Sequence, residues 1–450
     1  MNHPRFRSIG RRPRPFAFCT AIVTILLVSS GWAVPARAEV KPIPEDLTTL
    51  TLEDLLGIEV TSASKKLQRV SDAPAAIFVI TQDDIRTSGA TSIPELLRMV
   101  PGIQVARLDS NKWAVTSRGF EGRFANKLLV LFDGRTVYTP LFSGVFWEDQ
   151  DYLLEDIDRI EVIRGPGASL WGANAVNGVI NIITKHSKDT QGALISSGAG
   201  TYEQGFVGVR YGGRLSPNLT YRLYGKYFNR GTFDDEWGMQ GADDWWAYRS
   251  GFRLDYDKPG KDALTLQGDL YHLDSGSRYL VPAFTAPYAD LFDHTSNHPG
   301  GNVLFRWSHT FSPSSQVSLI TYYDRAQVKD VILSNVTDTF DIDFQHTLKL
   351  APWNELIWGL GYRYYRDNID NSEVVTFDPS HTRNQLLSAF IQDEFKFLDD
   401  HLRLTLGSRF EHNDYTGFEA QPTARLLWAP NPDHSVWTAF SRAVRTPSQV

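Results

Sequence analysis

The first half of the chain alternates short apolar runs with glycine-rich turns. The apolar run from Leu128 to Phe132 is short enough for a buried strand. Residues 157–163 alternate apolar and polar side chains, which predicts a half-buried strand, and residues 178–183 form a third β-type run. Turn signals at Asp133-Gly134 and at residues 164–167 separate these runs. This pattern predicts a small α+β unit.

From Gly192 onward the pattern changes to longer segments with a period of two. In residues 219–230, one face carries Tyr221, Leu223 and Tyr227, and the other carries Arg222, Tyr224 and Lys226. Residues 263–271 and 401–411 alternate in the same way. Strands of a transmembrane barrel need one face for lipid and one for a polar lumen, and they must close because lipid leaves no backbone group unpaired.

Short turns alternate with longer links between these segments. The short turns fall at residues 216–218, 258–260, 312–314, 351–352, 399–400 and 431–433, and the longer links at 230–245, 274–301, 330–335 and 368–383. Outer-membrane barrels have this asymmetry, with short periplasmic turns and long external loops. A soluble β-sandwich is the alternative, but the segments are too long and too evenly spaced to favour it.

The N-terminus has the pattern of a secretory signal peptide. Basic residues precede an apolar stretch from Phe16 to Val28, and Ala36-Arg37-Ala38 provides a small-residue cleavage site. Arg11-Arg12 could indicate a twin-arginine signal, but prolines 13 and 15 interrupt that pattern and favour the general route. The only cysteine, Cys19, lies in this segment, so we expect no disulfide and no thiolate metal site after cleavage.

Charge excludes one class of partner. The chain has 45 Lys and Arg against 52 Asp and Glu, a net charge of −7. Removal of residues 1–38 takes away six arginines and no acids, which leaves 39 against 52 and a net charge near −13. A nucleic-acid-binding surface needs a basic footprint, so we expect no nucleic acid partner.

The order of the motifs carries more information than their composition. The segments LLVLFDGRTVY, IDRIEVIRGPGASLWG and NAVNGVINIITK follow AAIFVITQDDIRTSGATSIPELLRMVPG and the Arg118-Gly119 element. Together they resemble the plug domain of TonB-dependent outer-membrane receptors over residues 58–185, and the remainder resembles the family by architecture. The resemblance implies a mainly β fold, in which a small α+β plug domain precedes an antiparallel transmembrane β-barrel.

The same resemblance implies a domain organisation. We expect a signal peptide over residues 1–38, an N-terminal extension with a candidate TonB box over 39–66, a plug over 67–186 and a partial barrel over 190–450. Barrels of this family have 22 strands, whereas about 13 are expected here. Residues 441–448 look like a strand running into an external loop. We therefore expect a C-terminally truncated barrel.

Site residues follow from the resemblance in three groups. A candidate TonB box consists of Ile58, Glu59, Val60, Thr61, Ser62 and Ala63, although this segment could also be an ordinary first strand of the plug. Candidate ligand contacts on the plug apices and an external loop are Asn111, Lys112, Trp113, Tyr138, Phe142, Phe146, Trp147 and Trp237, with plug–barrel packing as the alternative. A candidate latch between plug and barrel consists of Arg118, Arg164, Glu394 and Glu411.

The implied function is energy-dependent uptake of a large, scarce solute across the outer membrane of a Gram-negative bacterium. A ferric siderophore is the leading ligand, cobalamin is the close alternative, and haem, copper or an oligosaccharide remain open. The implied partners are the TonB complex, the ligand and outer-membrane lipid, and we expect a monomer.

Other classes of function fit the sequence less well. We expect no catalytic residues and no cofactor, because an outer-membrane barrel enzyme or a passive porin would not need a plug. Histidines 272, 294 and 298 lie near Asp290 and Asp293, but this loose spacing favours surface histidines over a metal site.

Overall fold

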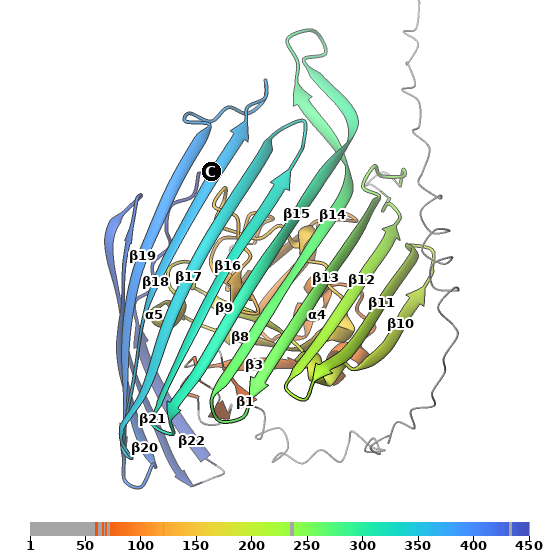
Figure 1. The fold of residues 1–450 in the computed structure, drawn as a ribbon. Coiled ribbons are helices and arrows are strands. Elements are labelled where there is room, and N and C mark those ends of the chain that lie inside the picture. Colours follow the sequence, from red (N-terminus) through yellow and green to blue (C-terminus); the bar gives the residue numbers. More distant parts are fainter. Residues whose placement is uncertain are drawn as a thin grey trace, which may run out of the picture. The chain divides into compact units, whose positions relative to one another are not determined.

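The computed structural model describes residues 59–61, 65–66, 68–69, 73–119, 121–234, 238–431 and 434–449. The predicted signal peptide and the box residues Ile58, Ser62 and Ala63 lie outside these ranges. The described chain contains a small N-terminal unit, which we call the plug, and a large antiparallel sheet, which we call the wall (Figure 1).

A five-stranded sheet forms the centre of the plug. Its order is β3-β8-β9-β6-β7, and its strands are β3 (Ile77–Thr81), β6 (Leu128–Phe132), β7 (Arg135–Thr136), β8 (Ile157–Arg164) and β9 (Gly178–Thr184). Only the β6–β9 pair is parallel. The three predicted strands are therefore confirmed.

Strand β6 shows why its sequence is apolar at every position. Leu128, Val130 and Phe132 belong to the larger core cluster, whereas Leu129 and Leu131 belong to a second cluster. Successive residues of a strand point to opposite faces, so both faces of β6 are buried.

Short helices and turns surround this sheet. They are α3 (Gln82–Ser88), α4 (Ile93–Leu96), η3 (Leu97–Met99), η4 (Trp147–Asp149), η5 (Leu154–Asp156), α5 (Ala168–Trp171) and η6 (Ser187–Thr190). Helix α3 begins at a capping box, in which the Asp84 amide donates to Thr81 Oγ1 and the Thr81 amide donates to Asp84 Oδ2. There are two further small antiparallel pairs. In the segment before the plug, β1 (Glu59–Val60) pairs with β2 (Gln68–Arg69), and within the plug, β4 (Ile103–Arg107) pairs with β5 (Trp113–Ser117).

The wall is a 13-stranded sheet in which each strand pairs with the next. Its strands are β10 (Gly192–Gly198), β11 (Glu203–Ser216), β12 (Leu219–Arg230), β13 (Trp245–Lys258), β14 (Asp262–Pro282), β15 (Ala289–Ser312), β16 (Ser315–Val328), β17 (Ser334–Ala351), β18 (Asn354–Asp370), β19 (His381–Phe397), β20 (Leu402–Asn413), β21 (Gly417–Asn431) and β22 (His434–Ser441). Within the described ranges the sheet does not close, and β10 and β22 are its two edges.

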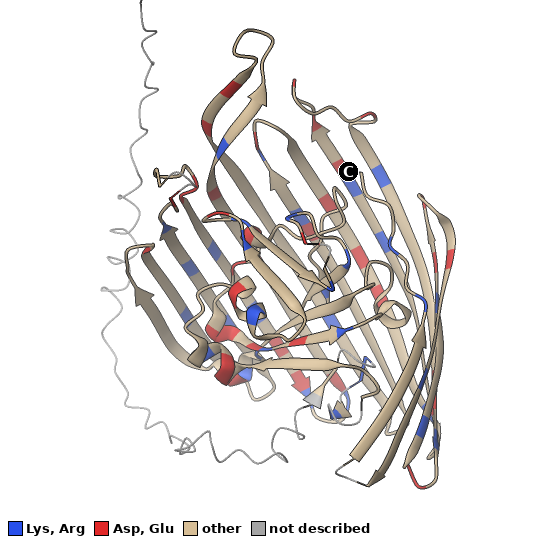
Figure 2. Cartoon of the chain, turned by 180° about the vertical axis from the view of Figure 1, so that it is seen from behind, with Lys and Arg blue, Asp and Glu red and all other residues tan. Residues whose placement is uncertain are grey.

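The predicted alternation along the wall is confirmed. On β12, Leu223 is 53% exposed on the outer face, whereas Arg222 is 4% exposed on the face toward the plug. Figure 2 shows charged residues both on the plug and on the wall strands around it. Among the described residues, no helix is both long enough and apolar enough to cross a membrane.

One predicted link is wrong. Residues 274–301 are not a loop, because β14 and β15 remain paired as far as Pro282 opposite Ala289 and form a hairpin that projects beyond the neighbouring strands (Figure 1). The polarity of this segment suggested a loop, but a hairpin needs paired backbone groups rather than an apolar face. The ion pair between Arg278 and Asp293 joins its two strands.

We expect the plug core to tolerate truncation poorly. Ile180 on β9 is 0% exposed, and its replacement by alanine leaves a cavity that costs about 2–5 kcal/mol of unfolding free energy. Ile195→Ala on β10, where the side chain is 75% exposed, is the control and should change stability far less. Denaturant unfolding of both variants in detergent measures the difference, and equal effects would contradict this packing.

Candidate functional site

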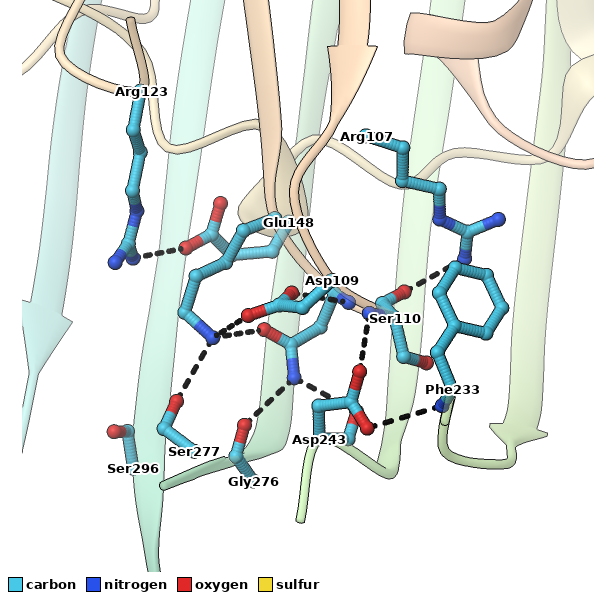
Figure 3. A network of polar contacts seen from close by, with 12 residues as sticks. Arg107, Asp109, Ser110, Arg123, Glu148, Phe233, Asp243, Gly276, Ser277 and Ser296 are labelled. Atoms are coloured by element: carbon cyan, nitrogen blue, oxygen red, sulfur yellow. Dashed lines mark hydrogen bonds and ion pairs between the residues drawn. The ribbon is translucent and has the colours of Figure 1, made fainter. Parts of the chain in front are cut away.

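The tip of the β4–β5 hairpin is embedded in the wall (Figure 3). Asn111 is fully buried, and its side-chain amide donates to the carbonyl oxygens of Asp243 at 3.0 Å and Gly276 at 2.9 Å. The Ser110 amide donates to Asp243 Oδ2 at 2.6 Å, and Lys112 Nζ donates to Ser277 Oγ at 2.8 Å. These contacts join the tip to β14 and to the link before β13.

Next to the tip, aromatic side chains of the plug and the wall pack against each other. The rings of Trp113 and Trp245 have centroids 5.8 Å apart, and those of Phe228 and Trp245 lie 4.6 Å apart. The Trp113 indole N–H donates to Glu95 Oε1 at 2.9 Å. Because the wall residues Phe228, Trp245 and Leu273 belong to the plug's larger core cluster, one apolar core spans both parts.

The second predicted apex, residues 138–149, also packs against the wall. Phe142 lies between Phe124 and Phe146, with centroid distances of 4.9 and 5.1 Å. His298 on β15 and Asp149 on the plug are both buried, and His298 Nδ1 lies 2.7 Å from Asp149 Oδ1. This pair holds η4 against the long hairpin.

Most of the candidate ligand contacts are therefore packing residues in this structure. The buried ones are Asn111, Lys112, Trp113, Phe142 and Trp147, whereas Tyr138 and Phe146 are partly buried and Trp237 lies outside the described ranges. Their contact with ligand stays a prediction. Sequence reasoning missed two exposed apolar residues of the plug, Leu108 (53%) and Phe124 (54%). In the sequence, each of them stands as one large apolar residue within a polar loop.

Helix α5 docks onto β20 through Glu411. Its carboxylate accepts hydrogen bonds from the Ala173 amide at 3.2 Å, from Arg409 Nε at 2.9 Å and from Gln421 Nε2 at 2.9 Å. Gly172 has φ +88°, and a Cβ there would lie 2.5 Å from Glu411 Oε1. Only glycine fits this close approach.

The partners of Glu411 differ from those that the sequence suggested. Arg164 Nη1 donates to the Pro101 carbonyl at 3.2 Å within the plug, and Arg118 is exposed with φ +62°. In the described part of the chain, neither arginine forms an ion pair with Glu394 or Glu411. Arg409, two residues away on the same strand, already provides the cation for Glu411.

Glu394 instead binds the segment before the plug, residues 59–61, 65–66 and 68–69, which we call the strap. Lys66 Nζ lies 2.7 Å from Glu355 Oε1 and 3.0 Å from Glu394 Oε1, and Lys65 Nζ lies 3.3 Å from Asp343 Oδ1. Burial lowers the pKa of Lys65. Burial also opposes the charge of Lys66, but the two glutamates outweigh it and raise its pKa.

The plug's Asp-Gly turn is held by the wall as well. Asp133 Oδ2 accepts hydrogen bonds from Thr184 Oγ1 and from Gln267 Nε2, both at 2.8 Å. Burial opposes ionisation of Asp133, but Arg253 and Arg306 outweigh it and hold its pKa below the usual range. Arg306 also donates to the Asp133 carbonyl.

Within the described ranges, no group of three or more His, Cys, Asp or Glu side chains could hold a metal ion. Two of the candidate histidines contact aspartates instead. These are His298 with Asp149, and His272 with Asp274, whose closest atoms lie 3.1 Å apart.

Two family models account for almost all of the described chain. The TonB-dependent receptor plug domain matches residues 69–179, and the TonB-dependent receptor-like β-barrel matches residues 189–450. The chain belongs to the TonB-dependent receptors. Both the plug and the antiparallel wall predicted for this family are thus confirmed.

Curated relatives of this receptor include an iron-regulated outer membrane protein and a vitamin B12 transporter. The iron-regulated outer membrane virulence protein of Vibrio cholerae is 26% identical over 404 residues, which are 86% of this chain and 60% of that protein. The vitamin B12 transporter BtuB of Vibrio cholerae is 35% identical over 144 residues, 32% of this chain and 23% of that protein. The receptor chain therefore spans less than two thirds of the length of these relatives.

Solved structures show the same fold. The siderophore receptor PirA of Acinetobacter baumannii superposes with a TM-score of 0.66 at 19% identity, over 82% of this chain and 61% of that one. A ferric enterobactin receptor of Pseudomonas aeruginosa in complex with enterobactin gives 0.65 at 18% identity, over 83% and 63%.

We expect loss of Glu411 to free helix α5 from the wall. Glu411→Ala leaves Arg409 without its carboxylate, and removal of one partner of a buried pair costs about 3–5 kcal/mol. Hydrogen exchange at the Ala173 amide should accelerate at least a hundredfold. Glu419→Ala is the control, because Glu419 lies opposite Glu411 on β21 but pairs with the half-exposed Arg442. Equal exchange in both variants would contradict the docking role of Glu411.

Proposed function

We propose that this receptor binds a ferric siderophore at its external mouth and transports it actively across the outer membrane. The relative that covers most of the chain supports an iron ligand, because an iron-regulated outer-membrane protein aligns with 86% of it. The solved structures of siderophore receptors are 18% and 19% identical, so they support the fold alone.

The need for energy follows from the shared core of plug and wall. Phe228, Trp245 and Leu273 of the wall are buried in one cluster with the plug. Displacing the plug exposes these side chains to water, and fully exposing a large apolar side chain costs about 1.5–3 kcal/mol. Buried polar contacts such as those of Asn111 and Glu411 add to that cost. Work must therefore be supplied before a large solute can pass, and we infer that the TonB complex supplies it.

The candidate TonB box, residues 58–63, is the proposed point of attachment. Strand addition to a partner needs an extended segment with unpaired backbone groups. Val60 is buried and pairs with Gln68, and the Thr61 amide donates to Glu161 Oε2 at 3.1 Å. These contacts must be released before the TonB complex can add a strand here, so we infer that the resting strap hides the attachment point.

Cobalamin is the second candidate ligand. It is favoured by the 35% identity with a vitamin B12 transporter, although that match covers 32% of the chain. In either case we propose an outer-membrane location and a transport role rather than catalysis.

Uptake measurements separate the ligand candidates. Cells that express the receptor from its complete gene are given radiolabelled ferric siderophores, cobalamin, haem and copper, with and without a protonophore. We expect concentrative uptake of a ferric siderophore that the protonophore abolishes while surface binding persists. Uptake of cobalamin alone would identify cobalamin as the ligand and would leave the proposed transport mechanism unchanged. Uptake that is insensitive to the protonophore would contradict active transport.

A proline in the candidate TonB box should uncouple ligand binding from uptake. Val60→Pro removes a backbone donor and disfavours pairing with an added strand, so we expect uptake to fall at least tenfold with surface binding unchanged. Val60→Ile keeps the donor and the β-propensity and is the matched control. Normal uptake by Val60→Pro would show that residues 58–63 are not the attachment point.

A further inference from the structure

The inner contacts of β16–β19 determine which of their residues face away from the plug. Successive residues of a strand point to opposite faces of the sheet. Four residues contact the plug or the strap and therefore face inward: Asp324 of β16, Asp343 of β17, Arg363 of β18 and Glu394 of β19. Residues an odd number of positions away from these on the same strand face outward.

Four charged residues form one row on that outer face. Arg325 on β16 lies opposite Asp338 on β17, Asp338 lies opposite Arg366 on β18, and Arg366 lies opposite Arg383 on β19. Each is an odd number of positions from the inward-facing residue of its own strand, so all four point away from the plug. We call these four residues the charged row.

The charged row lies where the apolar outer surface of the wall ends. Arg325 follows Ser315, the first residue of β16, by ten positions. At about 3.3 Å per residue and a tilt of about 40°, ten positions rise about 25 Å, which is the height of the apolar band of outer-membrane barrels. Because β16 begins at a short turn, which faces the periplasm in such barrels, the row lies at the external interface.

An aromatic row adjoins the charged row on its periplasmic side. Tyr323 lies opposite Phe340, and Phe340 lies opposite Tyr364, all of them on the outer face. Aromatic side chains gather at the level of the lipid headgroups in membrane proteins. The neighbouring row of charges is therefore placed to meet the headgroups themselves.

Asp338 neutralises one arginine of the row. Its Oδ1 accepts hydrogen bonds from Arg325 Nη1 at 3.0 Å and from the Tyr323 hydroxyl at 2.7 Å. Arg325 and Asp338 thus form a neutral ion pair. The positive charge of the row lies on the other two arginines.

Arg366 and Arg383 are two cations on directly opposite positions of adjacent strands. Both are exposed, and in the part of the chain that the structure describes neither has a carboxylate partner, whereas Arg366 Nε donates to Asn368 Oδ1 at 3.4 Å. Like charges in this arrangement destabilise a strand pair. A phosphate group between the two guanidinium groups removes the repulsion, because their planar forks of donors fit its oxygen atoms.

We propose that Arg366 and Arg383 bind a phosphate group of lipopolysaccharide, the phosphorylated glycolipid that forms the outer leaflet of the outer membrane. The external position of the charged row favours this lipid over the phospholipids of the periplasmic leaflet. Its acyl chains then lie against exposed apolar side chains nearer the periplasm, among them Leu360 and Leu387. This inference rests on the proposed outer-membrane location and not on the identity of the transported solute.

A titration with purified lipid tests the site. The complete receptor, freed of bound lipid, is titrated in detergent with diphosphoryl lipid A, the phosphorylated anchor of lipopolysaccharide, and native mass spectrometry measures the occupied fraction. We expect the double variant Arg366→Gln and Arg383→Gln to bind at least tenfold more weakly. The double variant Arg366→Lys and Arg383→Lys keeps both charges and should retain most of the affinity.

Arg278→Gln is the matched control. Arg278 is also an exposed arginine, but it lies on the projecting hairpin and pairs with Asp293, so its loss should leave lipid A binding unchanged. The unmodified receptor should bind phosphate-free lipid A at least tenfold more weakly than the diphosphoryl form. It should also prefer diphosphoryl lipid A to phosphatidylglycerol.

Three results would overturn the proposed lipid site. They are equal affinity of the glutamine double variant and the unmodified receptor for diphosphoryl lipid A, equal affinity of the unmodified receptor for the phosphate-free form, and equal affinity for phosphatidylglycerol. Because neither arginine contacts the plug or the strap, solute uptake by cells expressing the glutamine double variant should stay normal, which confirms that it folds. Failure of the unmodified receptor to take up any solute would contradict the proposed transport function instead.

Discussion

Burial of polar side chains between the plug and the wall governs this structure. The wall must be apolar outside and polar inside, and those inner polar groups lose water when the plug occupies the lumen. Each therefore needs a partner on the plug or on a neighbouring strand. Three buried groups satisfy this requirement. They are Asn111, which donates to two carbonyls, Asp133, which accepts from Thr184 and Gln267, and Glu411, which accepts from the Ala173 amide. They fix the orientation of the plug.

The apolar contacts between plug and wall differ in extent around the plug. The β12–β14 side shares the larger apolar core with the plug. The β15–β20 side has a cavity of mixed lining and smaller apolar clusters, such as Leu170 with Ile357 and Phe390. The N-terminal strap contacts the cavity side, because Lys65 and Lys66 form ion pairs with β17, β18 and β19.

The strands of this fold were easier to predict from the sequence than the residues that contact one another. Period-two alternation identified the inner face of the wall, and the continuous apolar run from Leu128 to Phe132 identified a strand buried on both faces. Both signals depend on local periodicity, which one sequence contains. The 274–301 hairpin was missed because its backbone pairing needs no apolar stripe, so its polar sequence looked like a loop.

Which side chains pair with one another depends on tertiary geometry, so these partners were harder to predict from the sequence. Glu411 is bound by a backbone amide and by an arginine on its own strand, so a search for complementary side chains pointed to Arg118 and Arg164 instead. Trp113 and Phe142 were ambiguous for a related reason, since an aromatic residue in a loop looks the same whether it meets a ligand or a wall. Leu108 and Phe124 were not predicted as candidate site residues, because isolated apolar residues in polar loops are common.

Native-state hydrogen exchange of the complete receptor tests the central claim most directly, because it measures the opening free energy of each segment separately. The account predicts that the amides of the strap, Val60 and Thr61, exchange at least a hundredfold faster than those of η6 and of Ser110 at the embedded apex. Uniform exchange of all these amides in one cooperative step would show that the strap and the plug open as one unit and would contradict the account.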